Sequence, residues 1–123
     1  MSVTAENVKQ IAFCTGKIYY ELDAKRKTLN NSETAIVRIE QLYPFPEKEF
    51  NEILKKYQNC KQIIWSQEEP ENMGAWNFIQ RMLPNFKFKL VARPAGGSPA
   101  TGLFEVHNRM QERILNETIE VIL

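Results

Sequence analysis

Short apolar runs alternate four times with segments of helical periodicity within the 123 residues of the chain. The apolar runs have the length of strands and lie at residues 8–14, 35–39, 63–65 and 86–92. Parallel strands need helical crossovers between them, so this alternation predicts a three-layer α/β/α sandwich with a small, mostly parallel sheet. We expect residues 1–7 to be a disordered or added N-terminal tail, and residues 8–123 to form a single α/β domain.

Each predicted helix has an apolar face. Residues 17–29 place Ile18, Leu22 and Leu29 on one side, and Glu21 stands at the right spacing to pair with Lys25. The next helix follows Pro46, which is suited to the first helical position. The apolar positions of the later helices recur every three or four residues: Phe50, Ile53, Leu54 and Tyr57; Trp76, Ile79 and Leu83; Leu103, Val106, Met110, Ile114 and Val121.

Composition excludes some classes of protein. Sixteen lysines and arginines against 15 aspartates and glutamates leave a net charge of +1, whereas a dedicated nucleic-acid binder needs a strongly basic surface. No apolar stretch approaches the roughly 20 residues of a membrane span, and the N-terminus lacks signal-peptide blocks. Cys14 and Cys60 border apolar runs and are predicted to be small buried residues instead of a disulfide pair. We therefore expect a soluble protein in a reducing compartment.

Thr15-Gly16-Lys17 stands where a strand ends and a helix begins. Free backbone N–H groups and the helix dipole favour an anion at such a point, and Lys17 would add a positive charge. A phosphate contact and a plain turn with a solvated lysine are both consistent with this pattern. The segment is not a P-loop, because Ile11 occupies the place of the first glycine of that motif.

The segment from Gln67 to Gly74 is acidic. Glu68, Glu69 and Glu71 are candidates for acid–base chemistry or for a hard cation. The alternative is structural: a carboxylate or Asn72 caps the helix that starts near Gly74.

His107 is the sole histidine of the chain. Its place on the apolar face of the last helix favours a packed residue, hydrogen-bonded to the loop that holds Ser98 and Thr101. A catalytic role is the weaker interpretation, because Ser98 lacks a nucleophile-elbow motif and the cysteines lack zinc-ligand spacing.

Two aromatic and two cationic residues lie near the same strand ends. Trp65 and Trp76 flank the acidic segment, where either could stack on a base, but their apolar-periodic positions favour core or interface anchoring. Arg38 and Arg93 are candidates for interdomain ion pairs or for phosphate contacts.

Four segments carry a resemblance to a known family. They are Cys14-Thr15-Gly16-Lys17-Ile18-Tyr19-Tyr20, Arg38-Ile39-Glu40-Gln41-Leu42-Tyr43-Pro44-Phe45-Pro46, residues 65–76 (WSQEEPENMGAW), and Ser98-Pro99-Ala100-Thr101-Gly102 followed by His107. In this order they strongly resemble the C-terminal domain of the E1 component of 2-oxoglutarate dehydrogenase. That domain is similar to the C-terminal domain of transketolase.

The resemblance implies a parent enzyme that lies mostly outside this chain. In that family, thiamine diphosphate and Mg²⁺ bind between earlier domains of a homodimer, 2-oxoglutarate is decarboxylated, and the succinyl group passes to lipoyl-bearing E2. The magnesium-binding Gly-Asp-Gly motif does not occur in this sequence. The resemblance therefore implies a structural and regulatory domain with no cofactor, metal or catalytic residue of its own, in the bacterial cytoplasm or the mitochondrial matrix.

Site residues follow from the same resemblance. Actinobacterial relatives bind the activator acetyl-CoA near the segment that corresponds to Thr15-Gly16-Lys17, which implies a CoA or nucleotide contact there, with Arg38 as a further candidate. Interdomain or structural roles fall to Gln67, Glu68, Glu69, Asn72, Trp76, Ser98, Thr101 and His107. Three alternatives stay open: a freestanding acyl-CoA or nucleotide sensor, an independent enzyme using His107 and the acidic segment, and the same domain of the 2-oxoadipate enzyme. Glu40-Gln41 and Ala75 look more like the 2-oxoglutarate enzyme.

Overall fold

The computed structural model describes residues 4–94 and 104–119, with side chains for residues 4–94 and 108–119. Within these ranges four strands form one sheet in the order β2-β1-β3-β4, and every neighbouring pair is parallel. The strands are β1 (Gln10–Cys14), β2 (Thr34–Arg38), β3 (Gln62–Pro70) and β4 (Phe88–Arg93). Strand β1 is buried along its whole length, as expected for an apolar run at the centre of a sheet. The predicted parallel sheet is confirmed.

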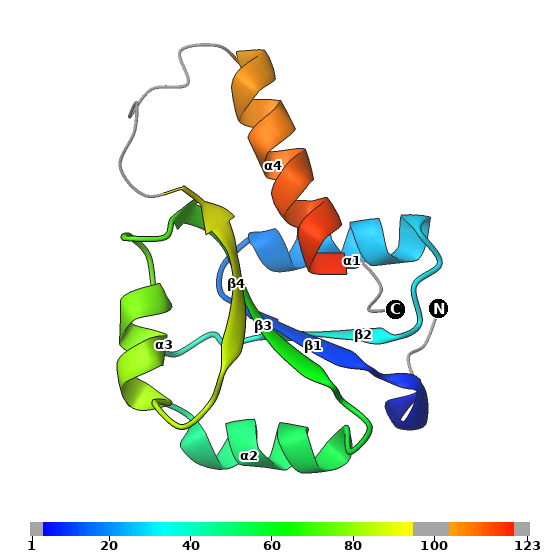
Figure 1. The fold of residues 1–123 in the computed structure, drawn as a ribbon, viewed down its shortest axis with the longest axis vertical. Helices are drawn as coiled ribbons and strands as arrows, with labels where there is room; N and C mark the ends of the chain where they lie inside the picture. Colours follow the sequence, from blue (N-terminus) through cyan, green and yellow to red (C-terminus); the bar gives the residue numbers. More distant parts are fainter. Residues whose placement is uncertain (1–3, 95–103, 120–123) are drawn as a thin grey trace.

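Helices cover both faces of the sheet (Figure 1). Helices α1 (Ile18–Thr28) and α4 (Phe104–Ile119) pack on one face, and α2 (Glu47–Lys56) and α3 (Trp76–Met82) pack on the other. A short 3₁₀ turn, η1 (Ala5–Asn7), precedes β1. The three-layer α/β/α arrangement is therefore confirmed.

The core under α2 and α3 is rich in aromatic residues. Phe13 of β1 packs on Phe50 of α2 with ring centroids 5.0 Å apart, and Phe86 meets Phe50 edge-on at 5.1 Å. Trp65, at the centre of β3, is fully buried. Burial of a large apolar side chain such as Phe13 or Phe50 stabilises a fold by about 1.5–3 kcal/mol, so this face holds a large share of the core energy.

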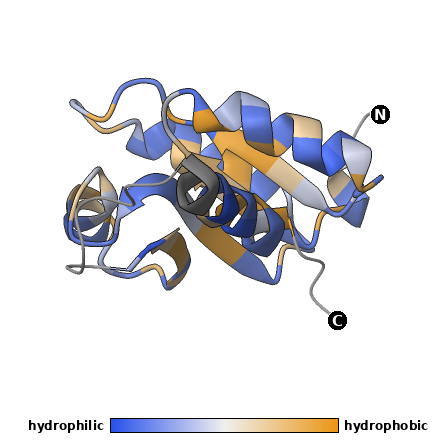
Figure 2. Ribbon diagram, turned by 90° about the horizontal axis from the view of Figure 1, so that it is seen from above, coloured by the Kyte–Doolittle hydropathy of each residue, from blue (hydrophilic) through white to orange (hydrophobic). Residues whose placement is uncertain are grey.

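The core under α1 and α4 is built from smaller side chains. Ala12 and Cys14 of β1 meet Ile18 and Leu22 of α1 and Ile114 of α4. Small residues on the sheet allow the two helices to approach it closely. Figure 2 shows hydrophobic residues gathered on the central strands, between helices whose outer faces are hydrophilic.

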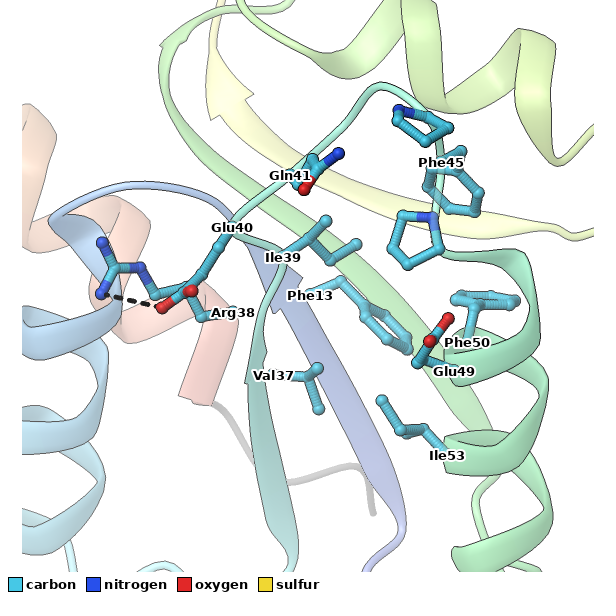
Figure 3. Close-up of a pocket in the computed structure, with 12 residues that line it drawn as sticks. Phe13, Val37, Arg38, Ile39, Glu40, Gln41, Phe45, Glu49, Phe50 and Ile53 are labelled. Atoms are coloured by element: carbon cyan, nitrogen blue, oxygen red, sulfur yellow. Dashed lines mark ion pairs between the residues drawn. The ribbon is translucent and has the colours of Figure 1, made fainter.

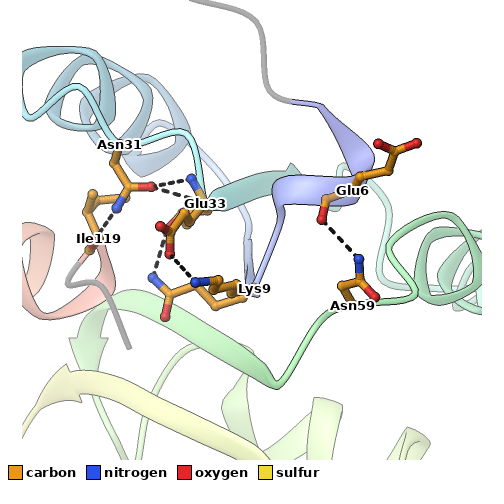
Figure 4. A network of polar contacts seen from close by, with 8 residues as sticks. Glu6, Lys9, Asn31, Glu33, Asn59 and Ile119 are labelled. Atoms are coloured by element: carbon orange, nitrogen blue, oxygen red, sulfur yellow. Dashed lines mark hydrogen bonds and ion pairs between the residues drawn. The ribbon is translucent and has the colours of Figure 1, made fainter. Parts of the chain in front are cut away.

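Buried polar side chains form hydrogen bonds that hold the C-terminal end of α4 against the sheet. Gln10 Nε2 donates to the Thr118 carbonyl at 3.2 Å. Asn31 Nδ2 donates to the Ile119 carbonyl at 2.8 Å, as Figure 4 shows. The Ser66 and Thr118 hydroxyls are 2.8 Å apart. The last carbonyls of a helix lack partners within the helix, so these side chains satisfy groups that would otherwise be buried unpaired.

Local predictions fail where neighbouring elements intervene. The expected loop at Gln67–Pro70 continues β3 instead, and Pro70 is in register with Arg93 of β4. Leu29 is 50% exposed and not part of the core, because α1 ends at Thr28 and the chain turns at Asn30, which has φ 52°.

Two predicted helix starts also differ. Pro46 precedes α2 as its N-cap residue instead of opening it, so the helix begins at Glu47. Helix α3 begins only at Trp76, and its N-cap residue, Ala75, makes no side-chain cap bond. The predicted capping of that helix by Asn72 or a carboxylate is therefore wrong.

Candidate functional site

The last residues of the four strands define one side of the sheet, here called the carboxyl edge: Cys14, Arg38, Pro70 and Arg93. Because all four strands are parallel, their carboxyl ends meet at the same edge, where ligands of α/β proteins usually bind. Most of the site residues predicted from the sequence lie in the segments that leave this edge.

Thr15, Gly16 and Lys17 form the turn from β1 into α1. Gly16 has φ +81°, and a Cβ placed on it would meet nothing within 4 Å. Thr15 is half-buried, whereas Gly16 and Lys17 are exposed. The turn therefore presents its backbone and one lysine to solvent at the start of a helix of 11 residues.

Arg38 faces the same turn from the neighbouring strand, in register with Cys14. Its guanidinium carbon lies 5.4 Å from the ring centroid of Tyr20, and Nη1 donates to the Tyr20 hydroxyl at 3.1 Å. Glu40 approaches Nη1 to 3.9 Å. The Nε atom of Arg38 is buried, and within the described part of the chain it has no hydrogen-bond partner. The structure thus places Arg38 at the carboxyl end of β2 and beside α1, and its predicted phosphate contact stays a prediction.

Cys14 is an inert thiol at this edge. Burial raises its pKa to about 12, against the lowering effect of the nearby Arg38 charge. The thiolate is the reactive form of cysteine, so the thiol is not a nucleophile at neutral pH. Burial also raises the pKa of Cys60, and both cysteines are free.

Gln67 points into the domain. Its Oε1 accepts a hydrogen bond from Trp65 Nε1 at 2.9 Å, while its Nε2 donates to the carbonyls of Pro70 at 2.8 Å and Met73 at 2.9 Å. Only 3% of Gln67 is exposed. The side chain therefore holds the turn that leads from β3 to α3, and it is not available to a ligand.

A second polar cluster joins α1, β3 and α4. Gln111 Nε2 donates to Glu21 Oε2 at 2.7 Å and to Glu68 Oε1 at 3.0 Å. Arg93 Nε donates to the Glu68 carbonyl at 2.9 Å. Nothing in the sequence pointed to Gln111, because its partners are 43 and 90 residues away.

The expected pair Glu21–Lys25 is replaced by contacts with α4. Lys25 forms its ion pair with Glu112, next to the contact of Glu21 with Gln111. Helix α4 lies across α1 and offers both residues a partner, which outweighs the weak attraction of an exposed pair within one helix.

The other polar residues of the acidic segment do not form a cluster. Glu69, Glu71 and Asn72 are exposed. Among residues 4–94 and 108–119, no group of three His, Cys, Asp or Glu side chains is arranged to hold a metal. The acidic segment therefore lacks the geometry for a cation site.

Trp65 and Trp76 have packing positions. Trp65 is fully buried, in agreement with a core role. Trp76 is half-buried and meets Phe88 edge-on, with ring centroids 6.1 Å apart. Ser98 and Thr101 lie outside the described residues, and His107 is described only as part of the backbone of α4. Their predicted roles stay predictions.

A pocket of about 570 Å³ opens at the carboxyl edge between β2 and α2. Figure 3 shows its walls: Phe13 and Val37 of the sheet, with Ile39 just after β2, face Phe50 and Ile53 of α2. The loop that contains Phe45 closes one side. No sequence motif indicated this pocket, because it depends on how far α2 reaches across the sheet.

The fold and this edge define a class: a parallel α/β domain whose polar strand ends are largely bonded within the domain. The chain belongs to the family described as 2-oxoglutarate dehydrogenase C-terminal, which it matches over residues 2–119. The resemblance inferred from the four sequence segments is confirmed.

Individual relatives agree with this family. The 2-oxoglutarate dehydrogenase E1 component of Rickettsia prowazekii is 44% identical over 125 residues, covering 95% of this chain and 13% of the relative. That of Cupriavidus necator is 43% identical over 118 residues, covering 92% and 12%. The 2-oxoadipate dehydrogenase complex component E1 of Danio rerio is 43% identical over 125 residues, covering 95% and 13%. Identity to these relatives therefore does not separate the two substrates, and the chain spans only 12–13% of their length.

The thiamine diphosphate and magnesium that the family implies do not fit the residues of this chain. The sequence contains no Gly-Asp-Gly, and the described residues present no cluster of metal ligands. No catalytic step through these groups is assigned to this domain. In the described part of the chain, no helix is long and apolar enough to cross a membrane.

Proposed function

We propose that this chain is the C-terminal structural domain of a 2-oxoglutarate dehydrogenase E1 subunit. One observation carries the proposal: the family match extends over residues 2–119, yet the chain spans 13% of relatives that bear this name. The full subunit, as a homodimer that works with lipoyl-bearing E2, would decarboxylate 2-oxoglutarate with thiamine diphosphate and Mg²⁺ bound outside this chain. The 2-oxoadipate enzyme is the alternative, and Glu40-Gln41 and Ala75 favour 2-oxoglutarate.

The polar contacts at the carboxyl edge support a structural role. Gln67 directs its hydrogen bonds to its own strand and to the turn after it, and Gln111 directs its hydrogen bonds to α1 and β3. A catalytic acid, base or nucleophile needs a group that is available to a substrate. Cys14, the cysteine at this edge, is not activated as a nucleophile, because burial raises its pKa to about 12, further above neutral pH than that of a free thiol.

A chimera tests the proposal. The matching C-terminal region of the R. prowazekii subunit is replaced by this chain, and carbon dioxide release from 2-oxoglutarate is measured with thiamine diphosphate and Mg²⁺. We expect activity from the chimera and none from the subunit truncated before this domain. The isolated chain serves as a further control, and turnover by it would overturn the assignment of the chemistry to other domains.

A second candidate function is the binding of an anionic effector, such as acetyl-CoA or a nucleotide, at Thr15, Gly16, Lys17 and Arg38. It is favoured by the buried Arg38 Nε, which has no partner within the described residues. Calorimetric titration of the chimera with acetyl-CoA and with AMP tests it. We expect binding that Arg38→Ala weakens and that Arg81→Ala, a change at an exposed arginine on α3, leaves unchanged. Equal affinities in the two variants would remove this function.

A further inference from the structure

The pocket between β2 and α2 exists because the helical layer stops short of the outer strand. Helix α2 packs through Phe50 onto Phe13 of β1, the neighbour of β2. Strand β2 is an edge strand, and its Val37 stays half-buried. Figure 3 shows Val37, Ile39 and Ile53 directed into the space that remains. The pocket is thus an uncovered part of the hydrophobic core.

Two glutamates line this largely apolar pocket, Glu40 and Glu49, and Glu40 is already paired with Arg38. Glu49, on the first turn of α2, is exposed and lines the pocket (Figure 3). Within the described ranges no ion pair involves Glu49. Arg38 extends to the other side of β2, where it pairs with Glu40. An occupant that fits this surface is therefore apolar and carries a basic group opposite Glu49.

An aromatic side chain projects beside the pocket. Tyr43 is 84% exposed, and Pro44 and Phe45, the next two residues of its loop, line the pocket. An exposed tyrosine next to an apolar pocket is typical of a protein–protein interface, because aromatic residues are enriched at the centre of such interfaces. A small molecule in the pocket would leave Tyr43 in water, so the two features together favour a protein occupant.

The lengths of the relatives indicate which protein segment occupies this surface. The matched region is the C-terminal part of the family, and it makes up 13% of the R. prowazekii subunit. Most of that subunit therefore precedes this domain and is available to cover an apolar surface on it.

We propose that Tyr43, the pocket and Glu49 form one docking surface for the preceding part of the E1 subunit. The docking segment inserts apolar side chains between Ile39 and Ile53, covers Tyr43, and places a basic side chain against Glu49. This inference rests on the proposed function and deepens it, because it names the surface through which the domain packs.

Cysteine labelling of the chimera tests the surface without relying on activity. Tyr43→Cys is compared with Leu29→Cys, a change at another exposed apolar residue at the far end of α1. The rate of reaction with a maleimide is measured on the peptide that carries the introduced cysteine, because Cys14 and Cys60 are also free thiols, and is divided by the rate for the same peptide in urea. We expect Tyr43→Cys to react about tenfold more slowly than when unfolded, because labelling then requires local opening, whereas Leu29→Cys should react at nearly its unfolded rate.

A charge reversal tests the role of Glu49. Glu49→Lys should speed the labelling of Tyr43→Cys about threefold, whereas Glu52→Lys, at an exposed glutamate on the same helix that does not line the pocket, should leave it unchanged. Equal effects of the two reversals would remove the basic contact from the proposal.

The outcomes separate this inference from the proposed function. An active chimera in which the Tyr43→Cys thiol reacts at the unfolded rate overturns the docking surface alone. An inactive chimera in which that thiol is protected supports the docking surface and contradicts the parent activity. A photo-crosslink from position 43 to the same domain of the second subunit would assign the surface to a second copy and overturn docking onto the preceding part.

Discussion

Trp65 and Gln67 face the same side of β3, and the indole Nε1 donates to the carboxamide oxygen of Gln67 at 2.9 Å. Side chains two residues apart in a strand project from the same face, so the contact follows from the strand itself. The other end of the carboxamide holds the carbonyls of Pro70 and Met73. One buried glutamine thus joins the aromatic core to the turn that follows it.

Gln67→Leu should lower the free energy of unfolding by about 3 kcal/mol, because it leaves the Trp65 N–H and two carbonyls without their partner. Urea unfolding followed by tryptophan fluorescence measures the loss. Gln80→Leu, the same change at an exposed position on α3, should cost little. Similar losses of unfolding free energy in the two variants would contradict the conclusion that the hydrogen bonds of Gln67 stabilise this turn.

Gly74→Ala should be more destabilising than Gly16→Ala. Both glycines have positive φ, +69° and +81°, which costs an alanine about 1–2 kcal/mol. A Cβ on Gly74 would also lie 3.2 Å from Gln67 Oε1, an atom fixed by Trp65, whereas Gly16 has open space. We expect Gly74→Ala to melt at the lower temperature. A reversed order in differential scanning calorimetry would show that the turn at Gly74 relaxes freely.

Gln111→Ala should lower the free energy of unfolding by about 1–2 kcal/mol, because the Glu21 and Glu68 carboxylates lose their shared donor and repel each other. Added salt should recover part of the loss by screening that repulsion. Asn116→Ala, at an exposed position on the same helix, is the control and should respond little to salt. Urea unfolding at low and high ionic strength measures both the loss of unfolding free energy and the part of it that salt recovers.

Stability should fall at alkaline pH through Cys14. Burial raises its pKa from 9.0 to about 12, so between these values the folded protein holds a proton that the unfolded chain has released. The contribution is complete below pH 9.0 and is lost as the pH rises towards about 12, at about 1.4 kcal/mol per pH unit. Cys14→Ala should show a shallower fall in unfolding free energy over this range. A parallel dependence in the two proteins would contradict the shifted thiol.

Part of the candidate site was accessible from the sequence. The ends of β1 and β2 could be located, so Thr15 and Arg38 were correctly expected near one edge of the sheet, whereas Gln67, expected in a loop, lies within β3. The inward direction of the Gln67 side chain could not be predicted. It depends on the carbonyls of Pro70 and Met73, which belong to the turn that contains Gly74. Gln111 produced no signal at all, since a polar residue on a helix is ordinarily solvated.

The sequence by itself determined the fold class, the two hydrophobic faces and the family, because periodicity and motifs are local properties of the chain. Only the tertiary structure decided which elements meet. It paired Lys25 with Glu112 instead of Glu21, extended β3 to Pro70, and left β2 partly uncovered beside Tyr43. The physical reason is that the apolar face of a helix is visible in its own sequence and shows that this face is buried. How much of the sheet the helix covers depends on side chains remote in the sequence.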